Sequence, residues 1–149
     1  MDSQREFIIR QLSVFLDNRL GSLAKVGRYL ADRKINLRAL SLAETRDFGT
    51  VRLIVTDTTS CAVALEADGY HCIESDVIAV AVTDRPGGIA DVLDLLASED
   101  IDIEYIYASV IKLNDRAVII LRVKDPMRAA IILRSQGIKV LSETEITSV

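Results

Sequence analysis

Charged and hydrogen-bonding side chains gather with glycine at two places where an apolar run gives way to a helical pattern. These stretches are Asn18-Arg19-Leu20-Gly21-Ser22-Leu23 and Asp84-Arg85-Pro86-Gly87-Gly88-Ile89. Glycine lets a ligand approach the backbone closely, and the unpaired N–H groups at the start of a following helix favour an anion. On the residues alone, each stretch predicts a strand, a turn and a helix, with a candidate site for a negatively charged group.

A turn without a ligand explains the same residues. In that interpretation Gly87 and Gly88 only allow a tight turn, because glycine adopts backbone angles that other residues avoid. Asp84 would then accept hydrogen bonds from the amides of the turn, and Arg85 would be solvated. The residue types leave both interpretations open.

The two stretches occupy equivalent places in two halves of the chain, residues 1–75 and 76–149. In each half the apolar pattern predicts a strand, a helix, two strands joined by a hairpin, a second helix and a short strand. The expected strands cover residues 12–16, 37–43, 51–55, 70–73, 78–82, 103–111, 117–123 and 138–141. Gly69 and Gly137 suit the ends of the second helices. We therefore expect an α+β chain of two ferredoxin-like domains, each in βαββαβ order with its helices on one face of an antiparallel sheet.

Each half is too short to bury a large core by itself, so docking of the two halves is expected. In the ferredoxin-like topology the second strand of each half, 37–43 or 103–111, lies at a sheet edge. Exposed apolar edges tend to be paired. Pairing of these two edges would place the domains side by side and give one continuous sheet of eight strands.

Composition excludes several classes of protein. Half of the 149 residues are hydrophobic, 27% are charged, and the net charge is −4 with both signs interspersed, which is typical of a packed globular protein. There is no basic region to hold a nucleic acid, and no apolar run is long enough to cross a bilayer. The N-terminus is unlike a secretory signal. We therefore expect a cytoplasmic protein with neither nucleic acid nor membrane as a partner.

No set of residues predicts an enzyme, a metal site or a bound cofactor. His71 is the only histidine, and no catalytic motif or full dinucleotide-binding glycine pattern is present. Cys61 and Cys72 lack C-x-x-C spacing and are expected to be buried free thiols. Tyr105 and Tyr107 share one face of an expected strand, where they could shape a pocket or simply pack at an interface.

The two turn stretches, together with Ile35-Asn36-Leu37 and Ile101-Asp102-Ile103 one helix later, resemble the ACT domain. The resemblance covers residues 11–146, and the whole chain is similar to a stand-alone pair of ACT domains. The first copy departs from the family pattern, because Leu20 stands where a proline is usual. The two turns are therefore not expected to be equivalent.

The resemblance implies side-by-side pairing of the domains and an amino acid or similar small effector bound at their interface near both turns. The implied ligand-binding residues are Asn18, Arg19, Leu20, Gly21, Ser22, Leu23, Asp84, Arg85, Pro86, Gly87, Gly88 and Ile89. Asp84 could accept hydrogen bonds from an ammonium group, and Asn18 offers a neutral version of that contact. The second turn, with Asp84, Gly87 and Gly88, is expected to contribute more to binding than the first.

Two functions follow as hypotheses. The first is a regulatory protein, expected as a homodimer, that binds an amino acid and signals to a partner enzyme or regulator. The second is a structural or interaction protein that assembles through its sheets with no ligand. An enzyme is a third and weaker interpretation, since a fold does not determine a function.

Overall fold

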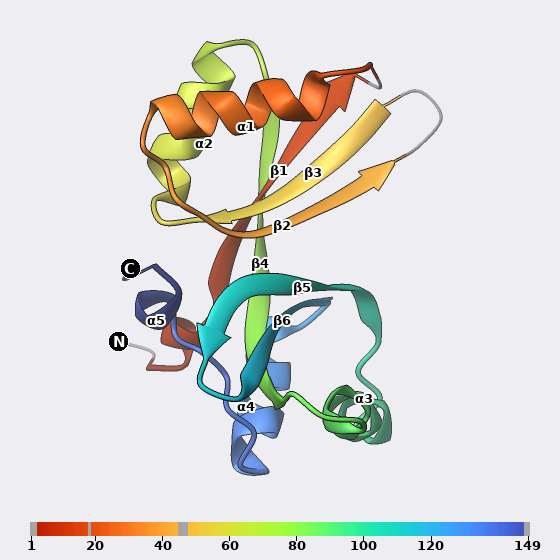
Figure 1. The fold of residues 1–149 in the computed structure, drawn as a ribbon. Helices are drawn as coiled ribbons and strands as arrows, with labels where there is room; N and C mark the ends of the chain where they lie inside the picture. Colours follow the sequence, from red (N-terminus) through yellow and green to blue (C-terminus); the bar gives the residue numbers. More distant parts are fainter. Residues whose placement is uncertain (1–2, 18, 45–47, 148–149) are drawn as a thin grey trace. The chain divides into compact units, whose positions relative to one another are not determined.

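The computed structural model of the chain describes residues 3–17, 19–44 and 48–147 (Figure 1). A short 3-10 helix, η1 (Ser3–Phe7), precedes the first strand. The strands are β1 (Ile9–Asp17), β2 (Leu37–Glu44), β3 (Phe48–Val55), β4 (His71–Thr83), β5 (Ile103–Leu113) and β6 (Arg116–Val123). The α-helices are α1 (Ser22–Asp32), α2 (Thr58–Ala67), α3 (Gly88–Ser98), α4 (Pro126–Ser135) and α5 (Glu143–Thr147). Two compact units form, Arg10–Ser75 and Asp76–Val149 together with Met1–Ile9.

In the unit Arg10–Ser75, β3 pairs antiparallel with both β1 and β2. Figure 1 shows α1 and α2 on the same side of these strands. Leu53 of β3 lies opposite Leu12 of β1 and belongs to a core that also contains Val26 of α1 and Leu65 of α2. The alternation of buried and exposed residues along β3 therefore directs one face of the sheet toward the helices.

In the second unit, β6 pairs antiparallel with both β4 and β5. Leu121 of β6 lies opposite Ile78 of β4, and both belong to a core with Leu96 of α3 and Leu133 of α4. Ile8, just after η1, also joins this core. The apolar residue after η1 explains why the first nine residues group with the C-terminal half.

The same local hydrogen bonds recur in the two units. After α1 the Ile35 N–H donates to the Leu30 carbonyl at 3.0 Å, and after α3 the Ile101 N–H donates to the Leu96 carbonyl at 2.9 Å. The helices α2 and α4 begin in the same way, because Asp57 and Asp125 are both N-caps that accept a backbone N–H bond. The prediction of an α+β chain with two βαββαβ-type units is confirmed at this level.

The prediction of eight separate strands is wrong, because the described residues form six. The two strands expected over 70–73 and 78–82 are one strand, β4, since no glycine or proline interrupts residues 71–83. The last expected strand, 138–141, contributes only an isolated bridge between Val140 and Val80. The chain then forms α5, whose Ile146 is buried.

Candidate functional site

The two turn stretches have the same backbone geometry. In the first, the Arg19 N–H donates to the Asp17 carbonyl at 2.8 Å, and the Ser22 N–H donates to the Arg19 carbonyl at 3.2 Å. In the second, the corresponding distances are 2.9 Å from Arg85 to Thr83 and 3.1 Å from Gly88 to Arg85. The sequence repeat is therefore a repeat of structure, with a helix starting directly after each turn.

Glycine is required just before each of these helices. Gly21 has φ 89° and Gly87 has φ 92°, in the left-handed region that a side chain disfavours. Neither helix start has a side-chain cap on its N–H groups. These helix starts therefore keep donors that an anionic group can use.

The two turns differ at the next position. A Cβ atom on Gly88 would overlap the carbonyl oxygen of Thr83, so only glycine fits there without movement of the backbone. The first turn carries Ser22 at the equivalent place. The expected difference between the two copies thus appears at this position as well as at Leu20.

A mostly apolar pocket of about 360 Å³ lies against the first turn. We name it the apolar pocket; its lining residues are Leu16, Asp17, Arg19, Leu20, Gly21, Ser22, Leu23, Ala24, Leu42 and Gly49. Five of the predicted ligand-binding residues, Arg19 to Leu23, are therefore brought together. Asn18 lies outside the described residues. The side chain of Leu20 is fully exposed at this pocket.

Leu42 and Gly49 were missed from the sequence. Strand register explains their presence, because Gly49 of β3 lies opposite Leu16 of β1 and Leu42 lies on the neighbouring β2. A Cβ on Gly49 would lie 3.3 Å from the Leu42 Cδ1 atom, so glycine allows the leucine to pack closely there. Gly49 is the second residue of β3, and a glycine inside a strand often marks a close approach of this kind.

The second turn contributes one predicted residue to the pocket beside it, whereas the first turn contributes five. Asp84, Arg85, Pro86, Gly87 and Ile89 are exposed. Gly88 lines a pocket of about 160 Å³ with residues of β4, α3 and β6. The Asp84 N–H donates to the Asp115 carbonyl at 3.2 Å, which holds the turn against the β5–β6 hairpin.

The two thiols pack in the core of the unit Arg10–Ser75. Cys61 of α2 is buried, and Cys72 of β4 is partly buried. Burial raises the pKa of Cys61 to about 11, and the nearby Cys72 adds to the effect. Burial also raises the pKa of Cys72 to about 11. Both groups are therefore held as neutral thiols at neutral pH.

The remaining candidates from the sequence lie apart from the turns. His71 is exposed and stacks on Phe15, with ring centroids 5.1 Å apart. Tyr105 and Tyr107 stack on one another along β5, with centroids 6.5 Å apart. Across residues 3–17, 19–44 and 48–147, no group of three or more His, Cys, Asp or Glu could hold a metal ion. In the same part of the chain, no helix is long and apolar enough to span a membrane.

Comparison with solved structures agrees with this architecture. Protein BT0572 from Bacteroides thetaiotaomicron is 31% identical, with a TM-score of 0.88, and the match covers 96% of this chain and 98% of that one. The regulatory subunit of aspartate kinase from Thermus thermophilus is 20% identical, with a TM-score of 0.62 over 85% of this chain and 91% of that one. Its counterpart from Thermus flavus is 17% identical, with a TM-score of 0.57 over 86% and 92%. The two kinase subunits share the fold with this chain.

No functionally curated protein matches the chain. The family model described as an ACT domain pair matches residues 7–149, which include both turns and both units. The resemblance drawn from the turn residues is confirmed by this match. The chain therefore belongs to the ACT domain pair family.

Proposed function

We propose that this protein is a regulatory module that binds a free amino acid in the apolar pocket and signals its presence to a partner protein. The observation that carries the proposal is the pocket itself, which is built on the strand–turn–helix stretch that the family repeats. Ligand sites are usually concave and mostly apolar, with a few polar groups that orient the ligand. The apolar pocket fits that description.

The lining suggests how an amino acid would be held. Arg19 and the free N–H groups at the start of α1 can bind a carboxylate, and Asp17 can accept hydrogen bonds from an ammonium group. Leu20, Leu23 and Leu42 offer apolar contacts for a side chain. We infer that a neutral, apolar amino acid is preferred at the first turn.

The second turn belongs to the proposal as a weaker contributor. Its predicted residues Asp84, Arg85, Pro86, Gly87 and Ile89 are exposed on the turn, and Gly88 is restricted by Thr83. Because five predicted residues of the first turn line one pocket, we rank the first turn above the second, in the opposite order to that expected from the sequence. Asn18 remains a proposed contact of the first turn.

Regulation requires that the ligand bind one state of the protein more tightly than another. Regulatory subunits of aspartate kinase share this fold, which supports a role in controlling a separate protein. We propose that the reader of the signal is a partner enzyme or regulator, and that the module acts as a homodimer in the cytoplasm. Dimers are the commonest closed assemblies.

A thermal-shift screen with the free amino acids tests the proposal. A ligand at a hundred times its dissociation constant stabilises the folded state by about 2.7 kcal/mol, which is easily seen in a melting curve. L-leucine is expected to stabilise the protein, and Leu20→Ser is expected to reduce this shift. Val63→Ser is the matched control, because Val63 is an exposed apolar residue on α2 of the same unit. Failure of every amino acid at millimolar concentration would contradict the proposal.

A structural or interaction protein is the second candidate. It is favoured by large apolar side chains exposed on β2 and β5, namely Leu40, Leu42, Ile106 and Val110. Exposed apolar residues on a strand favour association. Solution mass with and without amino acids separates the two candidates, because this second function predicts an assembly that ligands do not change.

A further inference from the structure

The second helices of the two units each carry a large apolar side chain on the surface. Val63 of α2 is 64% exposed, and Ile131 of α4 is 45% exposed. Each is the sixth residue after the aspartate that caps its helix, which is Asp57 in α2 and Asp125 in α4. Single exposed apolar residues are common on protein surfaces. Here, however, the same exposure recurs at the same helix position in both units.

The solvent side of α2 lacks the charged residues that usually cover a surface helix. The helix reads Thr-Thr-Ser-Cys-Ala-Val-Ala-Leu-Glu-Ala, and Glu66 is its only charged residue. Cys61 and Leu65 belong to the core of the unit, whereas Val63 and, one turn later, Ala67 are exposed. A helix with apolar residues on both sides is normally covered on both sides. The exposed side of α2 therefore has the composition of a contact surface.

The charges around the two exposed apolar residues have opposite signs. The stretch 53–70, which includes α2, has no lysine or arginine, and its acidic residues are Asp57, Glu66 and Asp68. The stretch 126–142, which includes α4, has no aspartate or glutamate, and its basic residues are Arg128, Arg134 and Lys139. Three residues after the exposed apolar position, α2 has Glu66 where α4 has Arg134. The two helix surfaces share an apolar centre and are complementary in charge, which favours contact between them.

These charges are available for an intermolecular contact. Among the described residues, the Glu66 carboxylate makes no ion pair or side-chain hydrogen bond. The Arg128 Nη2 atom donates to the Glu99 carbonyl at 2.9 Å, which uses one of the five N–H donors of the guanidinium. The Glu99 carboxylate lies 3.9 Å from Arg128, beyond hydrogen-bond distance. The guanidinium carbon of Arg134 lies 3.8 Å from the centroid of the Phe7 ring, a contact that positions the side chain without neutralising its charge.

We propose that α2 of one copy of this protein packs against α4 of a second copy. With the two helices antiparallel and Val63 against Ile131, the residues one turn away also meet, and Glu66 lies opposite Arg128. In a two-fold symmetric dimer each copy contributes both helices, so the contact is made twice. This inference specifies the contact of the homodimer that the proposed function includes, and it does not depend on the binding of an amino acid.

Sedimentation velocity of the full chain over a range of concentrations tests the apolar part of the contact. The wild type is expected to form dimers. Val63→Ser and Ile131→Ser are each expected to weaken the dimer at least about tenfold, because each loses one buried apolar side chain. Val110→Ser is the matched control, because Val110 is an apolar residue on β5 that is 65% exposed. This control should associate as the wild type does.

Charge reversal tests which helix meets which. Glu66→Arg places a cation opposite Arg128, and Arg128→Glu places a carboxylate opposite Glu66, so each variant alone is expected to be mainly monomeric. In an equimolar mixture of the two variants, every contact between different chains again joins an arginine to a glutamate. The mixture is therefore expected to form dimers within about tenfold of the wild-type dissociation constant. Asp94→Arg on α3, another exposed charge on a helix, is the matched control and should associate as the wild type does.

The melting temperature of each variant checks that it is folded. The proposal is overturned if the wild type stays monomeric at all concentrations, or if the mixture of the two charge variants fails to associate. Weakening of the dimer by Val110→Ser, with no effect of Val63→Ser and Ile131→Ser, would place the interface on β5 and would also overturn it. Failure of L-leucine to bind, with the association pattern intact, would instead contradict the proposed function of the apolar pocket.

Discussion

The Cα atom of Gly88 faces the carbonyl oxygen of Thr83 so closely that no Cβ atom fits between them. The obstacle is backbone, not the flexible end of a side chain, so relief requires movement of β4 or α3. Gly88→Ala is therefore expected to lower the free energy of unfolding by about 1–3 kcal/mol, as overpacking does. Urea denaturation measures this change in the free energy of unfolding.

Ser22→Ala is the matched control for this substitution, because the equivalent position of the first turn already carries a Cβ atom. It should change the stability much less. An unchanged unfolding midpoint for Gly88→Ala would contradict the prediction, because it would mean that the second turn accommodates a Cβ atom as the first turn does at Ser22.

Replacement of Gly27 in α1 by alanine is expected to stabilise the protein, in contrast to Gly88→Ala. A Cβ at this position would meet no atom within 4 Å, and the residue lies inside a helix. Gly27→Ala is expected to raise the free energy of unfolding by about 0.5–1 kcal/mol, because glycine costs more backbone entropy in a helix than alanine does. Gly21→Ala should instead destabilise, since Gly21 has φ 89°. Thermal melting of the two variants should therefore shift in opposite directions.

The Tyr29 hydroxyl joins the two helices of its unit by donating to the Ala64 carbonyl at 2.6 Å. Tyr29→Phe keeps the ring that packs in the core and removes this bond. A loss of about 1 kcal/mol in the free energy of unfolding is expected. Tyr70→Phe is the control, because no hydrogen bond of the Tyr70 hydroxyl occurs among the described residues. Equal stability of the two variants would contradict a role for the Tyr29 bond.

Asp57 makes the stability depend on acidic pH. The backbone N–H of Ser60 donates to the Asp57 carboxylate at 3.1 Å and holds the pKa of that group below its ordinary value. Because the pKa is lower in the folded state, the stabilisation is present above the unfolded pKa and is lost as pH falls through the folded pKa. The stability advantage of the wild type over Asp57→Asn should shrink below about pH 4. Denaturation at several pH values measures this; a constant difference would contradict it.

The buried thiol of Cys61 makes the stability of the protein depend on pH in the alkaline range. Burial, with a smaller contribution from Cys72, raises the pKa of Cys61 from 9.0 to about 11. The unfolded chain therefore loses the thiol proton first, and the protein should lose stability as pH rises from about 9 to about 11. Cys61→Ala should be less stable at neutral pH because of the lost packing, but its stability should fall less over this range. Parallel pH profiles of variant and wild type would exclude Cys61 as the cause.

Local features of the fold could be read from the sequence because their causes are local. The positions of Gly69 and Gly137 after α2 and α4, where both glycines have left-handed angles, depend on residues within a few positions. The repeat of the turn was likewise visible as a repeat of residue types. These signals predicted the two βαββαβ-type units and the family.

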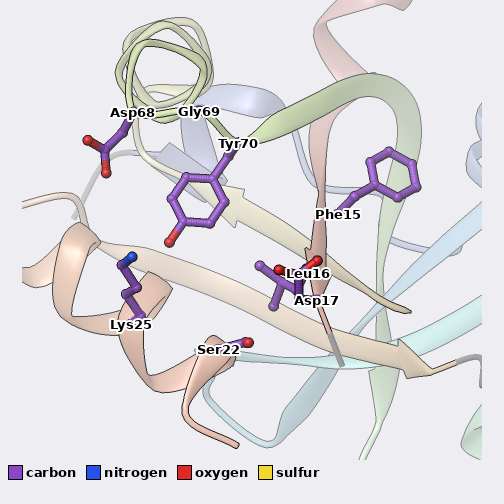
Figure 2. Close-up of a pocket in the computed structure, with 8 residues that line it drawn as sticks. All are labelled: Phe15, Leu16, Asp17, Ser22, Lys25, Asp68, Gly69 and Tyr70. Carbon is purple, nitrogen blue, oxygen red and sulfur yellow. The ribbon is translucent and has the colours of Figure 1, made fainter. Parts of the chain in front are cut away.

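The sequence by itself determined the repeated strand–turn–helix and five of the residues that line the apolar pocket. Only the tertiary structure decided that β4 is one strand, and that Leu42 and Gly49 join that pocket, because strand register brings distant residues together. It also brought Lys25, Asp68 and Tyr70, which lie in different parts of the sequence, to the lining of one hollow (Figure 2). A side chain that acts across a hollow leaves no periodic pattern along the chain, so its role becomes visible only once the helices have packed on the sheet.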